Sequence, residues 1–324
     1  MRELLELRWV HGLRHGELTG RPAHAAQALG RHRSPHPHKL PQEDAMSKAL
    51  PRLGAGLGYR TALHQDIVAN ADRIDFLEVI SDQYLYAPPE KLLRLLELGD
   101  AFPLIPHGVG LSVGTAAPLD GEYLDRLAQF VEATRGHWFS DHLSFTKTPD
   151  VDVEQLTPVW FTEESLEAVC RNVRQLKARI PEPPFLLENV TYYFPIPDND
   201  LSEADFITRV LEETDTGLLI DVNNIWINSV NLGFDPYEFL NSIPLERVVQ
   251  MHIAGGVELA GMLVDTHSSA VNEQVWALAA HVMERAPVKA ILLEWDSDWP
   301  EFAELLDHLD RARDLLPTPA KAGS

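Results

Sequence analysis

Histidine and carboxylate side chains recur along the chain, each near the end of a short apolar run such as FLEVI, PLIPH or ILLEWD. The set contains Glu78, His107, Asp141, His142, Glu188, Asn189, Asp221, Asn223, Asn224, His252, Asp265, His267, Glu294 and Asp296. Imidazole and carboxylate groups without thiolates suit Fe(II), Mn(II), Zn(II) or Co(II), and they do not suit Cu(I) or an iron–sulfur cluster. These residue types indicate metal chemistry if the side chains meet in space.

Taken singly, each of these residues is more simply a hydrogen-bonded polar group at the end of a strand. Gathered in one place they are costly, because a buried carboxylate without compensation is several kcal/mol less stable than a hydrated one. Shared cations remove that cost, so a common cluster predicts several metal ions. Glu188 offers two oxygens that can bridge neighbouring ions. Asp265 and His267 alternate on extended backbone, so both are expected to point the same way.

The apolar runs are predicted strands, and the stretches between them have helical periodicity, as in residues 119–134, 162–179 and 272–285. The strands are expected at residues 53–59, 74–80, 103–109, 137–145, 184–190, 217–223, 248–254 and 290–296. Such alternation predicts parallel strands with right-handed crossovers, in either a closed barrel or an open doubly wound sheet. Eight strands over about 265 residues favour a single-domain (βα)₈ TIM barrel, whose carboxyl-end rim would collect the polar set.

The two ends of the chain differ in composition from the remainder. Residues 1–50 contain six histidines, and the run RHRSPHPHKLPQ is typical of a disordered segment. We expect a disordered extension over residues 1–50, the catalytic barrel over 51–316 and a flexible tail over 317–324. The extension could bind metal through its histidines, but it is more simply dispensable, with Met46 as an alternative start.

Charge and composition exclude several functional classes. The net charge is −22, of which +3 falls on residues 1–50 and −25 on residues 51–324, so a nucleic-acid partner is not expected. No apolar run approaches the ~18–20 residues that a membrane span needs. The single cysteine, Cys170, is expected in the core and is typical of a cytoplasmic protein. Gly54, Gly56 and Gly58 lack the spacing of a dinucleotide loop and indicate close packing of the first strand.

In this order, the residues resemble a known family, the multinuclear non-heme iron-dependent oxidative enzymes, which include the methanobactin-biosynthesis iron oxidase. The resemblance covers about residues 51–316. It is most specific in HGVGLS and in the run DVNN…GFDP. The matching segments are GLGYR (56–60), HGVGLSVG (107–114), SDHLS (140–144), LENV (187–190), DVNNIWINSVNLGFDP (221–236), HIAG (252–255), VDTH (264–267) and LEWD (293–296).

The resemblance implies a barrel similar to xylose isomerase and to the three-metal apurinic endonuclease, with an assignment for each ligand. One iron would be held by His107, His142 and Glu188. A second would share Glu188 and be held also by Asp221, His252 and Glu294. A third would be held by Asp265 and His267, with Asn224, a weaker neutral ligand, where the endonuclease has a histidine.

Three further rim residues, Asp141, Asn189 and Asn223, are assigned catalytic roles. Asp141 either orients the imidazole of His142 as a hydrogen-bond acceptor or caps a loop. The sequence departs from the family pattern at Asp82-Gln83, where Glu-Asn is expected, and in the loop THSSAV, which lacks further acidic or histidine residues. Both departures concern substrate choice more directly than iron.

The activity implied by the resemblance is oxidation of a residue, most often cysteine, in a ribosomally made precursor peptide. It would use Fe(II)/Fe(III), two to three ions, with O₂ as co-substrate. No segment resembles a peptide-leader-binding domain, so a separate peptide-recognition partner protein is expected. Four aromatic residues could line a peptide groove or equally belong to the core: Tyr192, Tyr193, Trp226 and Trp295.

Other functions of the same barrel remain open at this point. A zinc-dependent hydrolase of the endonuclease type would use the same ligands to activate water. The acidic barrel weighs against DNA as its substrate, since DNA-binding proteins normally carry a basic footprint. A metal-dependent sugar isomerase would normally place a lysine at the rim, and no such lysine stands out. A non-catalytic binding barrel is disfavoured by the number of clustered ligands.

Overall fold

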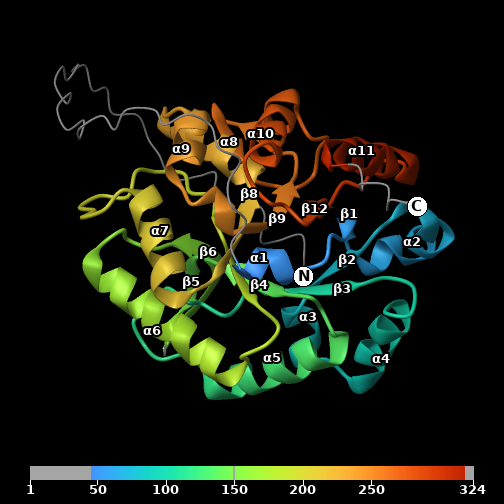
Figure 1. Ribbon diagram of the computed structural model, residues 1–324, viewed down its shortest axis with the longest axis horizontal. Coiled ribbons are helices and arrows are strands. Elements are labelled where there is room, and N and C mark those ends of the chain that lie inside the picture. Colours follow the sequence, from blue (N-terminus) through green and yellow to red (C-terminus); the bar gives the residue numbers. More distant parts are fainter. Residues whose placement is uncertain (1–44, 149, 318–324) are drawn as a thin grey trace, which may run out of the picture. The chain divides into compact units, whose positions relative to one another are not determined.

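The computed structural model describes residues 45–148 and 150–317, and within these ranges eight parallel strands close into a barrel (Figure 1). Each strand pairs in parallel with its two neighbours. Around the barrel they run β1 (Gly54–Gly58), β12 (Ala290–Leu293), β9 (Val248–Ile253), β8 (Gly217–Asp221), β7 (Phe185–Glu188), β4 (Phe139–His142), β3 (Leu104–His107) and β2 (Leu77–Ile80). The expected TIM barrel is confirmed.

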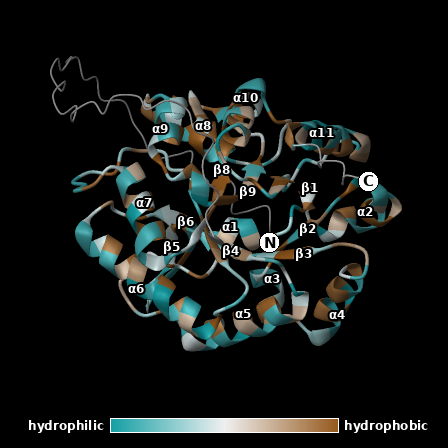
Figure 2. Ribbon diagram, in the orientation of Figure 1, coloured by the Kyte–Doolittle hydropathy of each residue, from teal (hydrophilic) through white to brown (hydrophobic). Residues whose placement is uncertain are grey.

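Helices surround the barrel on its outer side (Figure 1). Figure 2 shows that they combine hydrophilic and hydrophobic residues, as expected for helices with one face on a barrel and one in water. No helix in the described ranges is long and apolar enough to cross a membrane. The helices around the barrel are α2 (His64–Ala69), α3 (Asp82–Leu85), α4 (Pro89–Leu98), α5 (Gly121–Thr134), α6 (Glu163–Arg179), α7 (Glu203–Thr214), α8 (Val222–Leu232), α9 (Pro236–Ser242), α10 (Glu273–Met283) and α11 (Phe302–Leu315).

Side-chain caps determine where several of these helices begin. Asp120 accepts hydrogen bonds from the first backbone amides of α5, and Ser202 and Asn272 do the same for α7 and α10. The N-cap of α8 is Asp221, whose Oδ1 accepts from Asn224 N at 2.8 Å. The end of β8 and the start of α8 therefore share one of the predicted metal ligands.

Two antiparallel hairpins interrupt the alternation of strands and helices. The first pairs β5 (Ser144–Lys147) with β6 (Asp152–Pro158), and the second pairs β10 (Val257–Leu259) with β11 (Met262–Val264). The predicted strand at 137–145 is therefore two strands, since β4 ends at His142 and β5 begins at Ser144. Both hairpins follow the carboxyl ends of barrel strands, where active sites of this fold form.

Inside the barrel, side chains alternate with a period of two residues along each strand. An apolar residue of one layer is followed, two residues further along the chain, by Glu, Asp or His; Phe76 lies just before β2 and Glu294 just after β12. The buried pairs are Phe76 and Glu78, Ile105 and His107, Leu186 and Glu188, Leu219 and Asp221, and Leu292 and Glu294. A Cβ at Gly56 would lie 2.4 Å from the Phe76 ring, so the first strand is packed closely, as its glycines indicated.

The amino end of the barrel is covered by a short helix, α1 (Ala45–Ala49). Leu50 and Leu53 pack against the apolar layer, and Leu53 N donates to the carbonyl of Lys289 at 2.8 Å. Folded structure thus precedes residue 51, the predicted start of the barrel. The rest of the predicted extension and nearly all of the tail, residues 1–44 and 318–324, lie outside the described residues. Cys170 is buried in α6, as expected.

Candidate metal centre

Six side chains from six strands meet at the carboxyl end of the barrel. His107, His142, Glu188 and Asp221 are the last residues of β3, β4, β7 and β8. His252 lies one residue before the end of β9, and Glu294 follows β12. All six are buried. Residues separated by up to 187 positions are thus brought to one site by the closed sheet.

The first group consists of His107, His142 and Glu188. Glu188 Oε2 lies 3.5 Å from His107 Nε2 and 3.3 Å from His142 Nε2. This buried oxygen has no hydrogen-bond partner. Two ligand atoms that are each about 2.1 Å from one ion lie about 3.0–3.4 Å apart at octahedral or tetrahedral angles, so the spacing suits a metal ion.

The second group consists of Glu188, Asp221, His252 and Glu294, whose ligand atoms lie within 4.8 Å of one another. His252 Nδ1 is 3.2 Å from Glu188 Oε1 and 3.3 Å from Glu294 Oε2. Asp221 Oδ2 is buried without a hydrogen-bond partner. The two oxygens of Glu188 face different groups, which is the arrangement of a bridging carboxylate.

The third group consists of His267, Glu294 and Asp296. His267 Nδ1 is 3.5 Å from Glu294 Oε2 and 3.4 Å from Asp296 Oδ2. Arg60 contacts the same Asp296 and lies 3.7 Å from Glu294, so a permanent cation borders this group. Asp265 lies at the other ring nitrogen of His267, with Oδ1 2.8 Å from Nε2.

This third group differs in composition from the set predicted from the sequence. The amide of Asn224 makes two hydrogen bonds: Oδ1 accepts from Thr191 Oγ1 at 2.5 Å and Nδ2 donates to the carbonyl of Asn189 at 3.1 Å. The same Thr191 hydroxyl lies 3.3 Å from Asp265 Oδ2, so Asn224 remains beside a predicted ligand of the third iron. Asp296, the last acid of the LEWD segment, was among the metal-competent residues of the sequence but was not assigned to a metal ion.

The three residues assigned catalytic roles make hydrogen bonds around the ligands. The amide of Asn189 exchanges two hydrogen bonds with the backbone of Asp221, at 2.9 and 3.0 Å. Asn223 donates to Asp265 Oδ1 at 3.0 Å. Asp141 accepts from the backbone amides of His142 and Leu111, which makes it a loop cap.

The acceptor for His142 Nδ1 is the carbonyl of Gly108, at 3.1 Å. Asp141 Oδ1 is 3.9 Å from that nitrogen, beyond hydrogen-bond reach. Of the two roles considered for Asp141, the structure favours the loop cap.

Residues 54–317 match the family described as "RiPP precursor modification enzyme MbnB/TglH/ChrH", where a RiPP is a ribosomally synthesised and post-translationally modified peptide. The chain belongs to this family. The match confirms the resemblance inferred from the sequence.

Among the relatives, a UPF0276 protein of Caulobacter vibrioides is 36% identical over 262 residues, which cover 80% of this chain and 93% of the relative. A UPF0276 protein of Pseudomonas aeruginosa is 36% identical over 264 residues, covering 81% and 92%. A D-psicose 3-epimerase from Clostridium cellulolyticum H10, solved with D-tagatose, superposes with a TM-score of 0.52. It is 10% identical over 80% of this chain and 96% of that chain, a likeness in fold alone.

In this family member the clustered charges shift one another's protonation. Burial opposes ionisation of Glu188, but the imidazoles of His252 and His142 lower its pKa to about 2. Burial likewise opposes protonation of His142, but the Glu188 carboxylate raises its pKa to about 9. Burial, with Glu188 nearby, raises the pKa of Asp221 to about 8. Without a metal ion, protons on the histidines supply the positive charge that the carboxylates require, and a bound ion would replace them.

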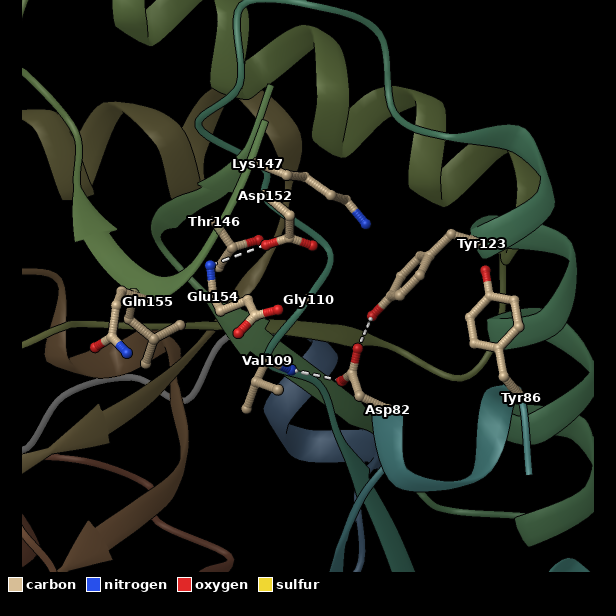
Figure 3. A pocket seen from close by; sticks show the side chains of 11 residues that line it. Asp82, Tyr86, Val109, Gly110, Tyr123, Thr146, Lys147, Asp152, Glu154 and Gln155 are labelled. Atoms are coloured by element: carbon tan, nitrogen blue, oxygen red, sulfur yellow. Dashed lines mark hydrogen bonds between the residues drawn. The ribbon is translucent and has the colours of Figure 1, made fainter. Parts of the chain in front are cut away.

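A cavity of about 500 Å³ borders the segments that follow His107 and His142. Figure 3 shows Asp82 at one side, where it accepts hydrogen bonds from Tyr123 Oη at 2.9 Å and Val109 N at 2.8 Å. The cavity is lined also by Tyr86, Thr146, Lys147, Asp152, Glu154 and Gln155, among others. Most of the wall comes from the β5–β6 hairpin, which was not predicted from the sequence, whereas Asp82 and the HGVGLSVG segment, which contains Val109 and Gly110, had been singled out.

The four aromatic residues near the rim fall into both predicted classes. Tyr192 and Trp295 are buried, and Tyr192 Oη donates to Glu203 at 2.7 Å. Tyr193 is 37% exposed, and its hydroxyl accepts from the backbone of Asp265 at 3.2 Å. Trp226 is partly buried against the core. Only Tyr193 combines exposure with contact to the residues around the third group.

Proposed function

We propose that this chain is an iron- and O₂-dependent oxidase that modifies a residue of a ribosomally made precursor peptide, and that the modified residue is a cysteine. The observation that carries the proposal is the linkage of three ligand groups through Glu188 and Glu294, in a member of a family of peptide-modifying enzymes. Two to three ions in the Fe(II)/Fe(III) states would occupy these groups.

Unpaired ligand atoms support the fit of a metal to this site. Among the buried side-chain atoms of the described residues that have no hydrogen-bond partner, three belong to ligands of the first two groups: Glu188 Oε2, Asp221 Oδ2 and His252 Nδ1. Each such atom costs about 1–3 kcal/mol when nothing compensates it. The three groups consist of carboxylates and imidazoles, and the described residues hold no thiolate at the site. Non-heme iron suits such a donor set, with its mixture of imidazole and carboxylate.

When bound, iron would supply one-electron chemistry with O₂ and a position at which a substrate thiolate can bind. The protein's own part is to hold the ligands in register. Glu188 sets the spacing of the first two groups through its two oxygens. Asn189 holds the backbone of Asp221, and Asp141 holds the loop after His107. We therefore assign Asn189 and Asp141 positioning roles, and Asn223 the same role toward Asp265.

The substrate and partners belong to the same proposal. The cavity between Asp82 and the β5–β6 hairpin offers a place for the peptide, with two tyrosines and several polar side chains to contact it. A separate protein is proposed to recognise the precursor peptide. The single cysteine fits a reducing cytoplasm, which we propose as the location.

Metal analysis of protein purified without oxygen tests the proposal. We expect two to three irons per chain, visible absorbance, and O₂ consumption when a cysteine-containing precursor peptide is added, with the mass change located by tandem mass spectrometry. His281→Gln is the matched control, because His281 is partly exposed on α10 and bonded to Asn241, outside all three groups. Zinc as the sole metal, together with cleavage of abasic DNA, would show a hydrolase instead.

A further inference from the structure

The carboxylate of Glu78 lies behind His252, on the side of the imidazole opposite the second group. Glu78 Oε2 is 3.1 Å from His252 Nε2, whereas His252 Nδ1 faces the ligands Glu188 and Glu294. Glu78 is 2% exposed and belongs to none of the three groups. The two nitrogens of this imidazole therefore face different surroundings. An acceptor beside Nε2 would favour the proton on Nε2, whereas a donor there would favour the proton on Nδ1.

Trp138 determines the orientation of the amide that lies beside this pair. An indole N–H can only donate, and Trp138 Nε1 donates to Gln250 Oε1 at 2.6 Å. The amide nitrogen of Gln250 must then point the other way, where it donates to Glu78 Oε2 and lies 3.0 Å from His252 Nε2. Because an amide nitrogen accepts no hydrogen bond, the acceptor for an N–H at His252 Nε2 is Glu78.

We propose that Glu78, held in place by Gln250 and Trp138, is a positioning residue that keeps the proton of His252 on Nε2 and leaves Nδ1 as the metal ligand. Nδ1 is buried and has no hydrogen-bond partner. A carboxylate behind a ligating imidazole fixes the ring and raises the basicity of the ligating nitrogen. The inference rests on the metal-binding part of the proposed function and needs neither iron nor the peptide.

The other two histidines of the first and second groups have neutral acceptors behind them. His107 Nδ1 is 2.8 Å from Ser140 Oγ, and His142 Nδ1 is 3.1 Å from the Gly108 carbonyl. Within the described ranges, Glu78 thus makes the second group different from the first. A carboxylate therefore lies behind the histidine of the second group, whereas neutral groups that only orient the ring lie behind the two histidines of the first group.

Zn(II) titration of the metal-free protein against a competing chelator provides the test. Glu78→Gln keeps the volume and removes the charge, and we expect the affinity of one Zn(II) to fall roughly 10- to 100-fold. The matched control is Ser140→Ala, which removes the neutral acceptor of His107 in the same barrel and should weaken the other Zn(II). Circular dichroism checks that both variants remain folded.

The tautomer of His252 provides a second readout that a merely structural role would not change. In long-range ¹H–¹⁵N spectra of the Zn(II) form, assigned with His252→Gln, wild-type protein should show the proton on Nε2 alone. Glu78→Gln should weaken or broaden that signal. If Glu78→Gln does not fold, Trp138→Phe keeps the ring, frees the Gln250 amide to turn and should produce the same change to a smaller degree.

An unchanged Zn(II) affinity in Glu78→Gln, or a proton found on Nδ1 of His252, would overturn the inference. Neither result would bear on whether the enzyme uses iron. Conversely, protein purified with no iron, and without peptide oxidation, would overturn the proposed function while leaving the Zn(II) result valid. The two hypotheses therefore fail separately.

Discussion

The two layers inside the barrel are built from the same strands and have opposite chemistry. Toward the amino end, Phe76, Ile105, Leu186, Leu219 and Leu292 form a buried apolar layer. Two residues further along each strand the side chain is a carboxylate or an imidazole. Both layers are removed from water, yet only the first is stabilised by burial itself. The carboxylates and imidazoles of the second layer need compensating charge. The residues that stabilise the fold and the residues that could bind metal therefore lie two positions apart on the same strands.

Paired substitutions on strand β8 give the largest contrast. Asp221→Ala should abolish metal binding at the second group and peptide oxidation, with the barrel still folded. Leu219→Ala, two residues earlier, should instead lower the free energy of unfolding by about 2–5 kcal/mol, since it leaves a cavity in the apolar layer. Metal content, peptide turnover and urea unfolding of both variants measure the difference. His142→Ala should repeat the result of Asp221→Ala at the first group.

Retained turnover in both Asp221→Ala and His142→Ala would contradict the ligand assignment. Unfolding of Asp221→Ala as severe as that of Leu219→Ala would contradict the separation of the two layers.

Loss of the metal ion and loss of one carboxylate should change the stability of the protein in opposite directions. In wild type, chelation should lower the melting temperature, because an ion present at 1,000 times its Kd stabilises the fold by about 4 kcal/mol. In Asp221→Asn the metal-free form should be more stable than metal-free wild type by about 1–3 kcal/mol, as one of several crowded carboxylates is gone. Calorimetry with and without chelator checks both signs. A metal-free Asp221→Asn less stable than wild type would mean that repulsion is not what the ions relieve.

A half-buried carboxyl outside the three groups shows by contrast what the neighbouring positive charges do. Glu203 begins α7, and its partner is the neutral hydroxyl of Tyr192 at 2.7 Å. Burial raises the pKa of Glu203 to about 7, whereas imidazoles lower that of Glu188 to about 2. The folded state thus holds the Glu203 proton more tightly than the unfolded state. Its contribution to stability is present below pH 4.5 and is lost as the pH rises through 7.

Glu203→Gln should therefore remove about 1–3 kcal/mol of the fall in unfolding free energy between pH 4.5 and 7. Urea unfolding at several pH values, with chelator present throughout, measures the slope. An identical slope in wild type and Glu203→Gln would show that the carboxyl is ionised in the folded state at neutral pH.

Regular elements and irregular ones differed in how far they could be predicted from the sequence. Apolar runs that end in Glu, Asp or His predicted the strands and the rim, because alternation along a strand is a local property. The surroundings of Asn224 and Asp296 are not local properties. They depend on Thr191, which donates to the Asn224 amide, and on the loop after β12, which brings Asp296 to His267. The β5–β6 hairpin was missed because its strand β6 is largely exposed and has little apolar alternation.

Glu78 shows the same limit within a regular strand. Its position on β2 was predicted, but its task depends on Gln250 and Trp138, which are brought to it from β9 and from the residue before β4. The spacing of residues along one strand does not predict which side chains from other strands will form hydrogen bonds with them.

The smallest predicted effect lies at the amino end, where α1 covers the apolar layer. Leu50 is partly buried and packs on that layer, so Leu50→Ala should lower the free energy of unfolding by about 1 kcal/mol. Metal content and turnover should not change, because the residue contacts the layer that carries no ligands. Lys48→Ala, on the exposed side of α1, is the control and should be neutral. A change in metal binding in Leu50→Ala would mean that the two layers are coupled, so that packing at the closed end of the barrel helps to set the ligand geometry at the open one.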